Sequence, residues 1–414
     1  MTFTKTENQF HADIGLTGRE ILLTIAVCLK MVVEILGLSV VPYALGLDFC
    51  AVVFKIMTYT SYLLVVLSFL LSSKITIAEL LRIMVLVAIT AVGSYFAGNG
   101  ILLTLIYLYG AKDIDVEKVF HILGYIYILL FILLVLASLA GIIENWDFPQ
   151  DGARQTRWAL GFTYPTHTSS ILFMSVLAFC YIKKEQLNLI HLAVIEGINL
   201  WIFSYTDSRA GMMMVALIPV VFYFLKFRKK EFRKTVFGWL QQWSFPVCAI
   251  AIYAVTMLYT GTGILAKIDK WLSWRFYYSN YSMNLYGVHL FGQDIEWVGW
   301  GGYGHTTDQL TGVYNFVDTS YLKLLLDNGL IVWLLIMIMW TAVCIIAYRN
   351  NKRYLTWALT FLAVYSLVEQ WLMNMGTNLF LLFLGAYIFR TIMQKTEQKK
   401  KENANIQQRA ENTY

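Results

Sequence analysis

The stretch NFVDTSYLKLLLDNGLIVW, from Asn315 to Trp333, begins polar, carries Asp318, Lys323 and Asp327, and then becomes apolar. The apolar residues continue beyond Trp333, which makes the segment long enough to cross about 30 Å of hydrocarbon. Charges in the first two turns of such a helix serve either as caps of the helix start or as the lining of an aqueous pocket. The choice depends on the side of the membrane from which the helix starts, and so on the rest of the chain.

The whole chain shares this apolar character. Its 414 residues are 58% hydrophobic and 14% charged, whereas a soluble protein has roughly a quarter charged residues. We therefore predict an all-α integral membrane protein of about 12 transmembrane helices, formed by residues 1–394, with a disordered basic cytoplasmic tail at 395–414. The expected spans are residues 20–44, 49–71, 78–97, 99–110, 118–142, 168–182, 187–205, 210–226, 237–261, 319–347, 354–373 and 376–391.

Basic residues are distributed unevenly between the loops. One alternate set contains most of them, including Lys183, Lys184, the cluster KFRKKEFRK at 226–234, Arg349, Lys352 and Arg353. Because cytoplasmic loops carry an excess of Lys and Arg, we place this set, and with it both termini, in the cytoplasm. Two outward loops are then long: residues 143–167, and residues 262–318 between the ninth and tenth spans.

Several function classes lack their sequence signals. The five cysteines are isolated, which argues against a disulfide framework and a zinc site. The sequence has no P-loop, no G-x-G-x-x-G and no H-E-x-x-H, so nothing indicates nucleotide hydrolysis or a bound metal. The basic residues lie at membrane edges, which gives no reason to expect nucleic-acid binding.

The loop at 262–318 is dense in Trp, Tyr, Gly and His. Aromatic residues of this kind either anchor a protein at the membrane interface or build a functional loop. An anchor alone does not need Arg275, His305 and Asp318, which this loop also contains. We therefore favour a functional loop.

Four arginines remain on the outward side, where positive charge is disfavoured: Arg154, Arg157, Arg209 and Arg275. The planar guanidinium binds phosphate oxygens in pairs, so a group of arginines at this surface suits a pyrophosphate on a lipid carrier. The alternative for each arginine is snorkelling or a structural ion pair, such as Asp207 with Arg209.

Charges within the spans also have two interpretations. Lys30 and Glu34 are four residues apart on one helix and can neutralise each other, so they are either functional or structural. Glu369 lies near the outer end of its span, close to the outward residues. Asp318 stands at the mouth of the tenth span, where it is either a helix cap or a general base that accepts a proton from a sugar hydroxyl.

Four segments follow one another as RWALGFTYPTHTSSILF, YTDSRAGMMM, WRFYYSNYSMN and VDTSYLKLLLDNGLI. In this order they resemble the bacterial polysaccharide polymerase and O-antigen ligase superfamily (Wzy and WaaL types), although Thr166 and His167 stand after Pro165 where that family has Asn. Asp318 stands where the ligases have His and where polymerases often have Asp. The resemblance therefore favours a polymerase over a ligase.

The resemblance implies a GT-C-like enzyme of the bacterial cytoplasmic membrane that polymerises lipid-linked oligosaccharide repeat units into a capsule, exopolysaccharide or O-antigen. The implied reaction is an inverting glycosyl transfer at the outer face, without metal or other cofactor. The donor is linked to undecaprenyl pyrophosphate, and the acceptor is the next lipid-linked repeat unit. Flippase and chain-length regulator proteins are implied partners beside membrane lipid.

The resemblance also implies roles for individual residues. Asp318 would be the general base, with His305 or Glu369 as substitutes. Arg209 and Arg275, supported by Arg154 and Arg157, would bind the donor pyrophosphate and stabilise its charge as it leaves. His167 and Tyr321 would face the substrate.

Two other functions stay open. A ligase of the same fold would transfer finished glycan to another acceptor. A transporter or flippase of lipid-linked sugars is expected to keep its charges near the bilayer midplane and to show related halves. Here the main charged group is outward, and no matching halves are visible.

Overall fold

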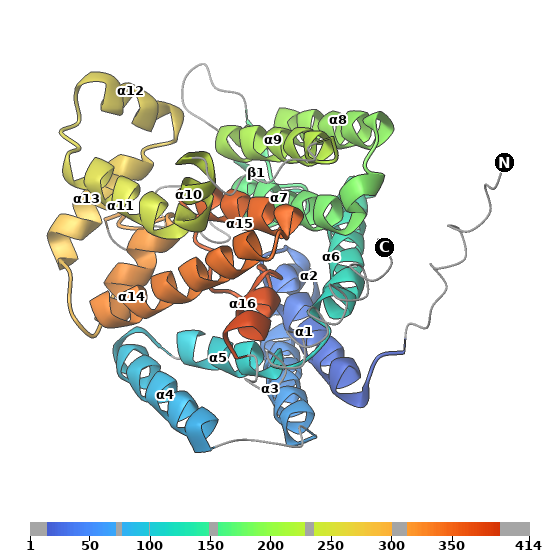
Figure 1. Cartoon of the computed structure of the whole chain (residues 1–414). Coiled ribbons are helices and arrows are strands. Elements are labelled where there is room, and N and C mark those ends of the chain that lie inside the picture. The colour runs from blue at the N-terminus through green and yellow to red at the C-terminus, as the bar shows by residue number, and fades with distance from the viewer. Residues whose placement is uncertain are drawn as a thin grey trace, which may run out of the picture.

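The computed structural model describes residues 15–71, 77–98, 100–148, 156–227, 236–299 and 313–389. These residues form an almost entirely helical fold (Figure 1). Within these ranges, the strands are β1 (Asp147–Phe148) and β2 (Arg157–Trp158), which pair antiparallel. The predicted all-α class is confirmed for the described residues, and the tail predicted at 395–414 lies outside them.

The helices, in chain order, are α1 (Gly18–Gly37), α2 (Val41–Leu45), α3 (Leu47–Leu70), α4 (Ile77–Ala97), α5 (Gly100–Gly110), α6 (Val116–Leu139), α7 (Pro165–Lys183), the 3-10 helix η1 (Lys184–Gln186), α8 (Leu189–Thr206), α9 (Arg209–Leu225), α10 (Val236–Gln242), α11 (Ser244–Met257), α12 (Gly263–Trp271), α13 (Arg275–Tyr286), α14 (Ser320–Arg349), α15 (Arg353–Tyr365) and α16 (Leu381–Ile388).

Five of these helices are long and apolar enough, by length and composition, to cross a membrane: α3, α6, α7 continued by η1, α8 and α14. The outward face of α3 exposes Phe49, Val52, Ile56, Tyr59 and Leu63. A helix that is apolar on its exposed face needs an apolar environment there. The fold is therefore compatible with a multi-pass membrane protein, and the number of twelve spans stays a prediction.

The helices near the C-terminus hold the fold together. α15 contacts both α7 and α14, and these three lie in the middle of the molecule (Figure 1). α8 and α9 pack beside α7, whereas α4 packs against α14, and α5 packs against α16. α12 and α13 lie at one end of the molecule and α6 near the other (Figure 1).

α14 is interrupted at Gly329, whose φ of 79° and ψ of 170° are not helical. Just after it, the Leu330 amide donates to His289 O (2.9 Å) in the segment that follows α13. A Cβ on Gly329 would lie 2.2 Å from Gly292 N, so only glycine permits this crossing of two backbones. Residues 320–328, which include Lys323 and Asp327, therefore form a short helix of their own before the wholly apolar part begins.

The end of the chain differs from the predicted spans at 354–373 and 376–391. Helix α15 ends at Tyr365 and α16 begins at Leu381, and residues 366–380 between them are irregular. Asn374 and Asn378 accept backbone hydrogen bonds from Gly376 and Phe380, two residues further on in each case. Such local bonds compete with helix formation. Glu369 thus lies in a turn-rich segment rather than in a helix.

Candidate functional site

Three residues predicted for the site meet at one point, which we call the Arg275 cluster. Arg275 Nε donates to Asp318 Oδ2 (3.1 Å), and Arg275 Nη2 donates to Glu369 Oε1 (3.0 Å). The side chains of Arg275 and Glu369 are 13% and 11% exposed, and that of Asp318 is 34% exposed. The cluster is thus a largely buried arginine shared by two carboxylates, of which Asp318 is the accessible one.

Asp269 fixes the helix that carries Arg275. Its fully buried carboxylate accepts from the amides of Phe276 (2.7 Å) and Tyr277 (3.1 Å) in the first turn of α13. A carboxylate at this position satisfies free amides and is favoured by the helix dipole. Arg275 is the first residue of α13, so by fixing the first turn of this helix Asp269 also fixes the position of the Arg275 backbone. Sequence reasoning missed Asp269, which stands inconspicuously between two lysines.

The start of α14 is bonded to the irregular segment that contains Glu369. The Ser320 amide donates to Ser366 O (3.0 Å) and to Glu369 O (3.1 Å), and Thr319 Oγ1 donates to Ser366 O (3.2 Å). Asp318 precedes this joint, and its carboxylate accepts from Arg275. The backbone contacts therefore hold the two carboxylates of the cluster at a fixed separation.

The charges of the cluster do not balance, because two carboxylates face one guanidinium. Burial raises the pKa of Glu369 to about 7; Arg275 opposes this shift, and the negative charge of Asp318 adds to it. Burial and the charge of Asp318 thus both favour the protonated form of Glu369. Burial also raises the pKa of the Tyr314 hydroxyl, and the charge of Asp318 raises it further, which keeps this neighbour neutral.

Arg157 and Arg209 form a second group, at the turn between α8 and α9. Arg157 is buried, and its Nε donates to Thr206 O (2.7 Å), while its guanidinium lies 5.6 Å from the centre of the Tyr164 ring. Arg209 Nε lies 3.4 Å from Asp207 Oδ1, which is the ion pair considered as the structural alternative. Neither arginine contacts the three residues of the Arg275 cluster through these bonds. Their predicted role in pyrophosphate binding stays a prediction.

The remaining predicted residues are placed as follows. His167 lies near the cluster: its ring is 5.8 Å from that of Trp371, two residues after Glu369, and its Nδ1 is 3.1 Å from Thr163 Oγ1. Tyr321 is fully buried, and its hydroxyl donates to Ala363 O (2.7 Å), so it packs α14 against α15. Arg154 and His305 lie outside the described residues.

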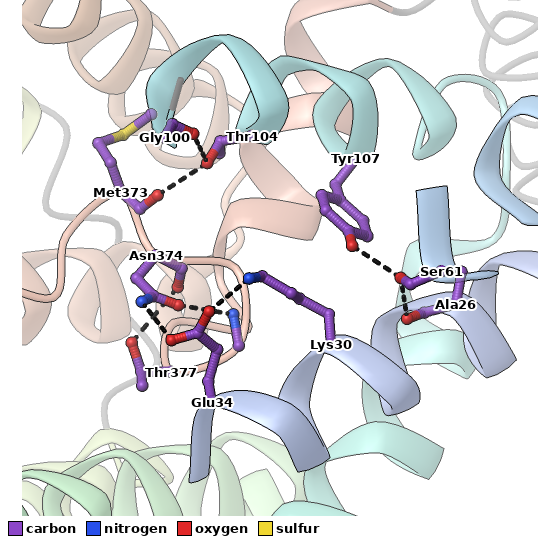
Figure 2. A network of polar contacts seen from close by, with 11 residues as sticks. Ala26, Lys30, Glu34, Ser61, Gly100, Thr104, Tyr107, Met373, Asn374 and Thr377 are labelled. Atoms are coloured by element: carbon purple, nitrogen blue, oxygen red, sulfur yellow. Dashed lines mark hydrogen bonds and ion pairs between the residues drawn. The ribbon is translucent and has the colours of Figure 1, made fainter. Parts of the chain in front are cut away.

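A cavity of about 330 Å³ is lined by charged as well as apolar side chains. Ser320 and Gln370, which are close to Asp318 and Glu369 in the chain, belong to its lining, whereas the three residues of the cluster do not. Figure 2 shows one wall, where Lys30 and Glu34 form an ion pair and Asn374 Nδ2 donates to Glu34 Oε2 (3.0 Å). The pairing of Lys30 with Glu34 is thus the one anticipated from their spacing. The structure adds Asn374 as a partner from the turn-rich segment.

The other wall comes from the short helix at the start of α14. Lys323 Nζ lies 3.5 Å from Asp327 Oδ2 and 3.9 Å from the centre of the Trp297 ring. Trp297 Nε1 in turn donates to Asp327 Oδ1 (2.8 Å). The first turns of α14 therefore line a cavity, which is one of the two roles considered for Lys323 and Asp327, and Trp297 covers them. Asp318 instead turns towards Arg275.

No protein-family model, curated protein or solved structure matches this chain. Among the described residues, no group of three or more His, Cys, Asp or Glu side chains is arranged to hold a metal ion. The fold and the site thus define a class only. It is an all-α protein, compatible with several membrane crossings, in which a buried arginine shared by two carboxylates stands beside a charge-balanced polar cavity.

Proposed function

We propose that the protein polymerises lipid-linked oligosaccharide repeat units into a polysaccharide at the outer face of the bacterial cytoplasmic membrane. The reaction would be a metal-independent, inverting glycosyl transfer from an undecaprenyl-pyrophosphate-linked donor. The observation that supports this proposal is the Arg275 cluster, which combines a proton acceptor and a cation for a phosphate leaving group within one set of hydrogen bonds.

In this mechanism Asp318, the accessible carboxylate, accepts the proton of an acceptor hydroxyl. The hydroxyl oxygen attacks the anomeric carbon of the donor from the face opposite the pyrophosphate. The new glycosidic bond forms as the bond from this carbon to the pyrophosphate oxygen breaks, and the electron pair leaves with the pyrophosphate. The configuration at that carbon is thereby inverted.

Proton uptake and charge stabilisation are coupled in such a cluster. Asp318 becomes neutral when it takes the proton, so Arg275 loses one of its two negative partners. Its positive charge is then available to the pyrophosphate as negative charge develops there. Glu369 keeps the guanidinium in position during the step through the second hydrogen bond.

The adjoining cavity is suited to the sugar of the acceptor. Two ion pairs, Lys30 with Glu34 and Lys323 with Asp327, line it with balanced charge, and they offer both donors and acceptors to hydroxyl groups. Its volume of about 330 Å³ lies at the lower end of the range for small-molecule sites, roughly 300–1,000 Å³. We propose that a sugar held there extends its reacting hydroxyl past Ser320 towards Asp318, which precedes Ser320 by two residues and does not itself line the cavity.

Reconstitution in liposomes tests the proposal. The purified protein is incubated with an undecaprenyl-pyrophosphate-linked repeat unit and a metal chelator, and the products are separated on a gel. We expect a ladder of regularly spaced bands with the wild type and with Asp48→Asn, which removes an exposed carboxylate from the start of α3. Asp318→Asn is expected to give no ladder. A normal ladder from Asp318→Asn would rule this residue out as the base.

Transport of lipid-linked sugars is the second candidate. The observation that favours it is the pair of charged walls that face a cavity within the helix bundle, since transporters place charged residues inside the membrane. In the same liposomes, transport predicts that the repeat unit keeps its length and crosses the bilayer. A ladder without such movement would exclude this candidate.

A further inference from the structure

A second, larger cavity lies at the end of α14 and the start of α15, whose opposite ends are close to Asp318 and Glu369 of the Arg275 cluster. Its volume is about 680 Å³, and its lining includes the end of α7, η1 and the start of α15. α15 begins at this cavity with Arg353 and ends at Tyr365, four residues before Glu369. Its 13 residues correspond to roughly 20 Å of helix, and the 19 of α7 to roughly 28 Å. The two places are thus separated by about the thickness of a bilayer core, near 30 Å.

The lining of this cavity is rich in positive charge. Four basic residues stand against two acidic ones: Lys183, Lys184, Lys352 and Arg353 against Glu117 and Glu185. All four belong to the loops that the distribution of basic residues assigns to the cytoplasm. An anionic group is therefore the ligand that this cavity favours.

Ion pairs hold two of the lysines in place without neutralising them. Glu117 Oε2 lies 2.9 Å from Lys184 Nζ, and Glu117 Oε1 lies 3.8 Å from Lys352 Nζ. The Tyr181 hydroxyl also donates to Glu117 (2.7 Å). One carboxylate thus positions two ammonium groups, and one positive charge is left over. Lys183, whose Nζ lies 5.9 Å from the centre of the Phe179 ring, adds another.

An exposed apolar strip leads away from the cavity along α6. Tyr125 lines the cavity, and the exposed side chains of Leu129, Ile132 and Leu136 follow it at spacings of four, three and four residues. Residues at these spacings share one face of a helix. A basic cavity that opens onto an apolar strip matches a molecule with an anionic head and hydrocarbon chains. A soluble anion would use only the cavity.

We propose that the cavity binds the headgroup of an anionic phospholipid from the leaflet opposite the Arg275 cluster, with the acyl chains along the exposed face of α6. Basic pockets between helices at the cytoplasmic surface are well suited to acidic headgroups. This proposal does not depend on the glycan chemistry proposed for the other face.

Binding is measured by native mass spectrometry of the full-length, delipidated protein, titrated with phosphatidylglycerol or with phosphatidylcholine of the same chains. The double variant Lys183→Gln with Lys352→Gln removes two positive charges from the cavity. Its matched control, Lys267→Gln with Lys270→Gln, removes two exposed charges from α12. We expect the cavity variant to bind phosphatidylglycerol roughly 10- to 30-fold more weakly and the control to bind it like the wild type.

Two further arms separate the sources of an anionic group. Glycerophosphoglycerol has the same head without chains, and we expect it to compete poorly; inorganic phosphate should behave likewise. Competition by either at the concentration of the lipid would assign the cavity to a soluble anion and overturn the proposal. Equal binding of both lipids, or equal loss in both double variants, would also overturn it. Lys183→Gln alone serves if the double variant unfolds, because Lys183 forms none of the ion pairs of Glu117.

Discussion

The two ion pairs of Arg275 should contribute unequally to the stability of the fold. Double-mutant cycles built from Arg275→Gln, Asp318→Asn and Glu369→Gln isolate each coupling energy, because effects common to a single variant cancel. The Arg275–Glu369 pair is buried on both sides, whereas Asp318 is about one-third exposed. Screening by solvent therefore acts mainly on the Asp318 pair.

The expected magnitudes follow from this difference. A hydrogen bond to a charged group in a buried setting contributes about 1.5–3 kcal/mol, so we expect a coupling of about 2–3 kcal/mol between Arg275 and Glu369. An exposed ion pair contributes about 0–1 kcal/mol, and we expect the coupling between Arg275 and Asp318 near the upper end of that range.

Tryptophan fluorescence during reversible unfolding in mixed micelles measures these energies. The experiment belongs at pH 8.5, above the pKa of about 7 of Glu369, so that its carboxylate is charged. Arg275→Gln combined with Asp48→Asn is the control and should show no coupling. A coupling with Asp318 that equals or exceeds the one with Glu369 would refute the reasoning from burial.

Three further predictions concern the same region. The pKa of Glu369 is raised to about 7 from an ordinary 4.5, so between these pH values the folded protein keeps a proton that the unfolded chain releases. The free energy of unfolding should therefore fall as pH rises from about 4.5 to 7. Glu369→Gln should flatten this slope in a pH series of unfolding curves. Gly329→Ala places a Cβ 2.2 Å from Gly292 N at a positive φ and should lower the free energy of unfolding by at least ~2 kcal/mol. The control Gly197→Ala meets nothing within 4 Å and should leave this free energy unchanged or slightly higher. Equal effects of the two variants would contradict the close crossing of the two backbones at Gly292 and Gly329. Asp269→Ala removes the bonds to the first turn of α13 and should lower the free energy of unfolding by about 1–2 kcal/mol. It should also lower the yield of the gel ladder, and Asp269→Asn should be intermediate in both measurements. A ladder of wild-type yield from Asp269→Ala would show that Arg275 is positioned by other contacts.

The three residues of the Arg275 cluster could be selected from the sequence, but the contacts between them could not be predicted. Arg275 stood out as a positive charge on the side predicted to be outward, where positive charge is disfavoured. Asp318 and Glu369 stood out as charges near the ends of predicted spans. They lie up to 94 positions apart in the chain. Their meeting depends on bonds of the Ser320 amide and hydroxyl to backbone groups of residues 366–372, which have no sequence pattern.

Other features were missed for identifiable reasons. The break at Gly329 follows Asp327-Asn328, and the run Asp-Asn-Gly is a turn signal that the apolar residues on both sides conceal. Likewise α15 ends at Tyr365, before Glu369, and the turn residues around Gly376 keep the chain out of a helix until α16 begins at Leu381. In both cases hydrophobicity indicated a helix, and local backbone chemistry decided its limits.

The crossing of backbones at Gly292 and Gly329 bears on how anything reaches the polar cavity. The amides of Leu330 and Ile331 donate to the carbonyls of His289 and Leu290, in the segment that follows α13. Lifting that segment would strand both amides in apolar surroundings, at several kcal/mol each. The segment that runs from His289 to Trp297 is thus held in place by backbone hydrogen bonds and is not free to swing open. A ligand that enters the cavity therefore does so without displacing His289 and Leu290.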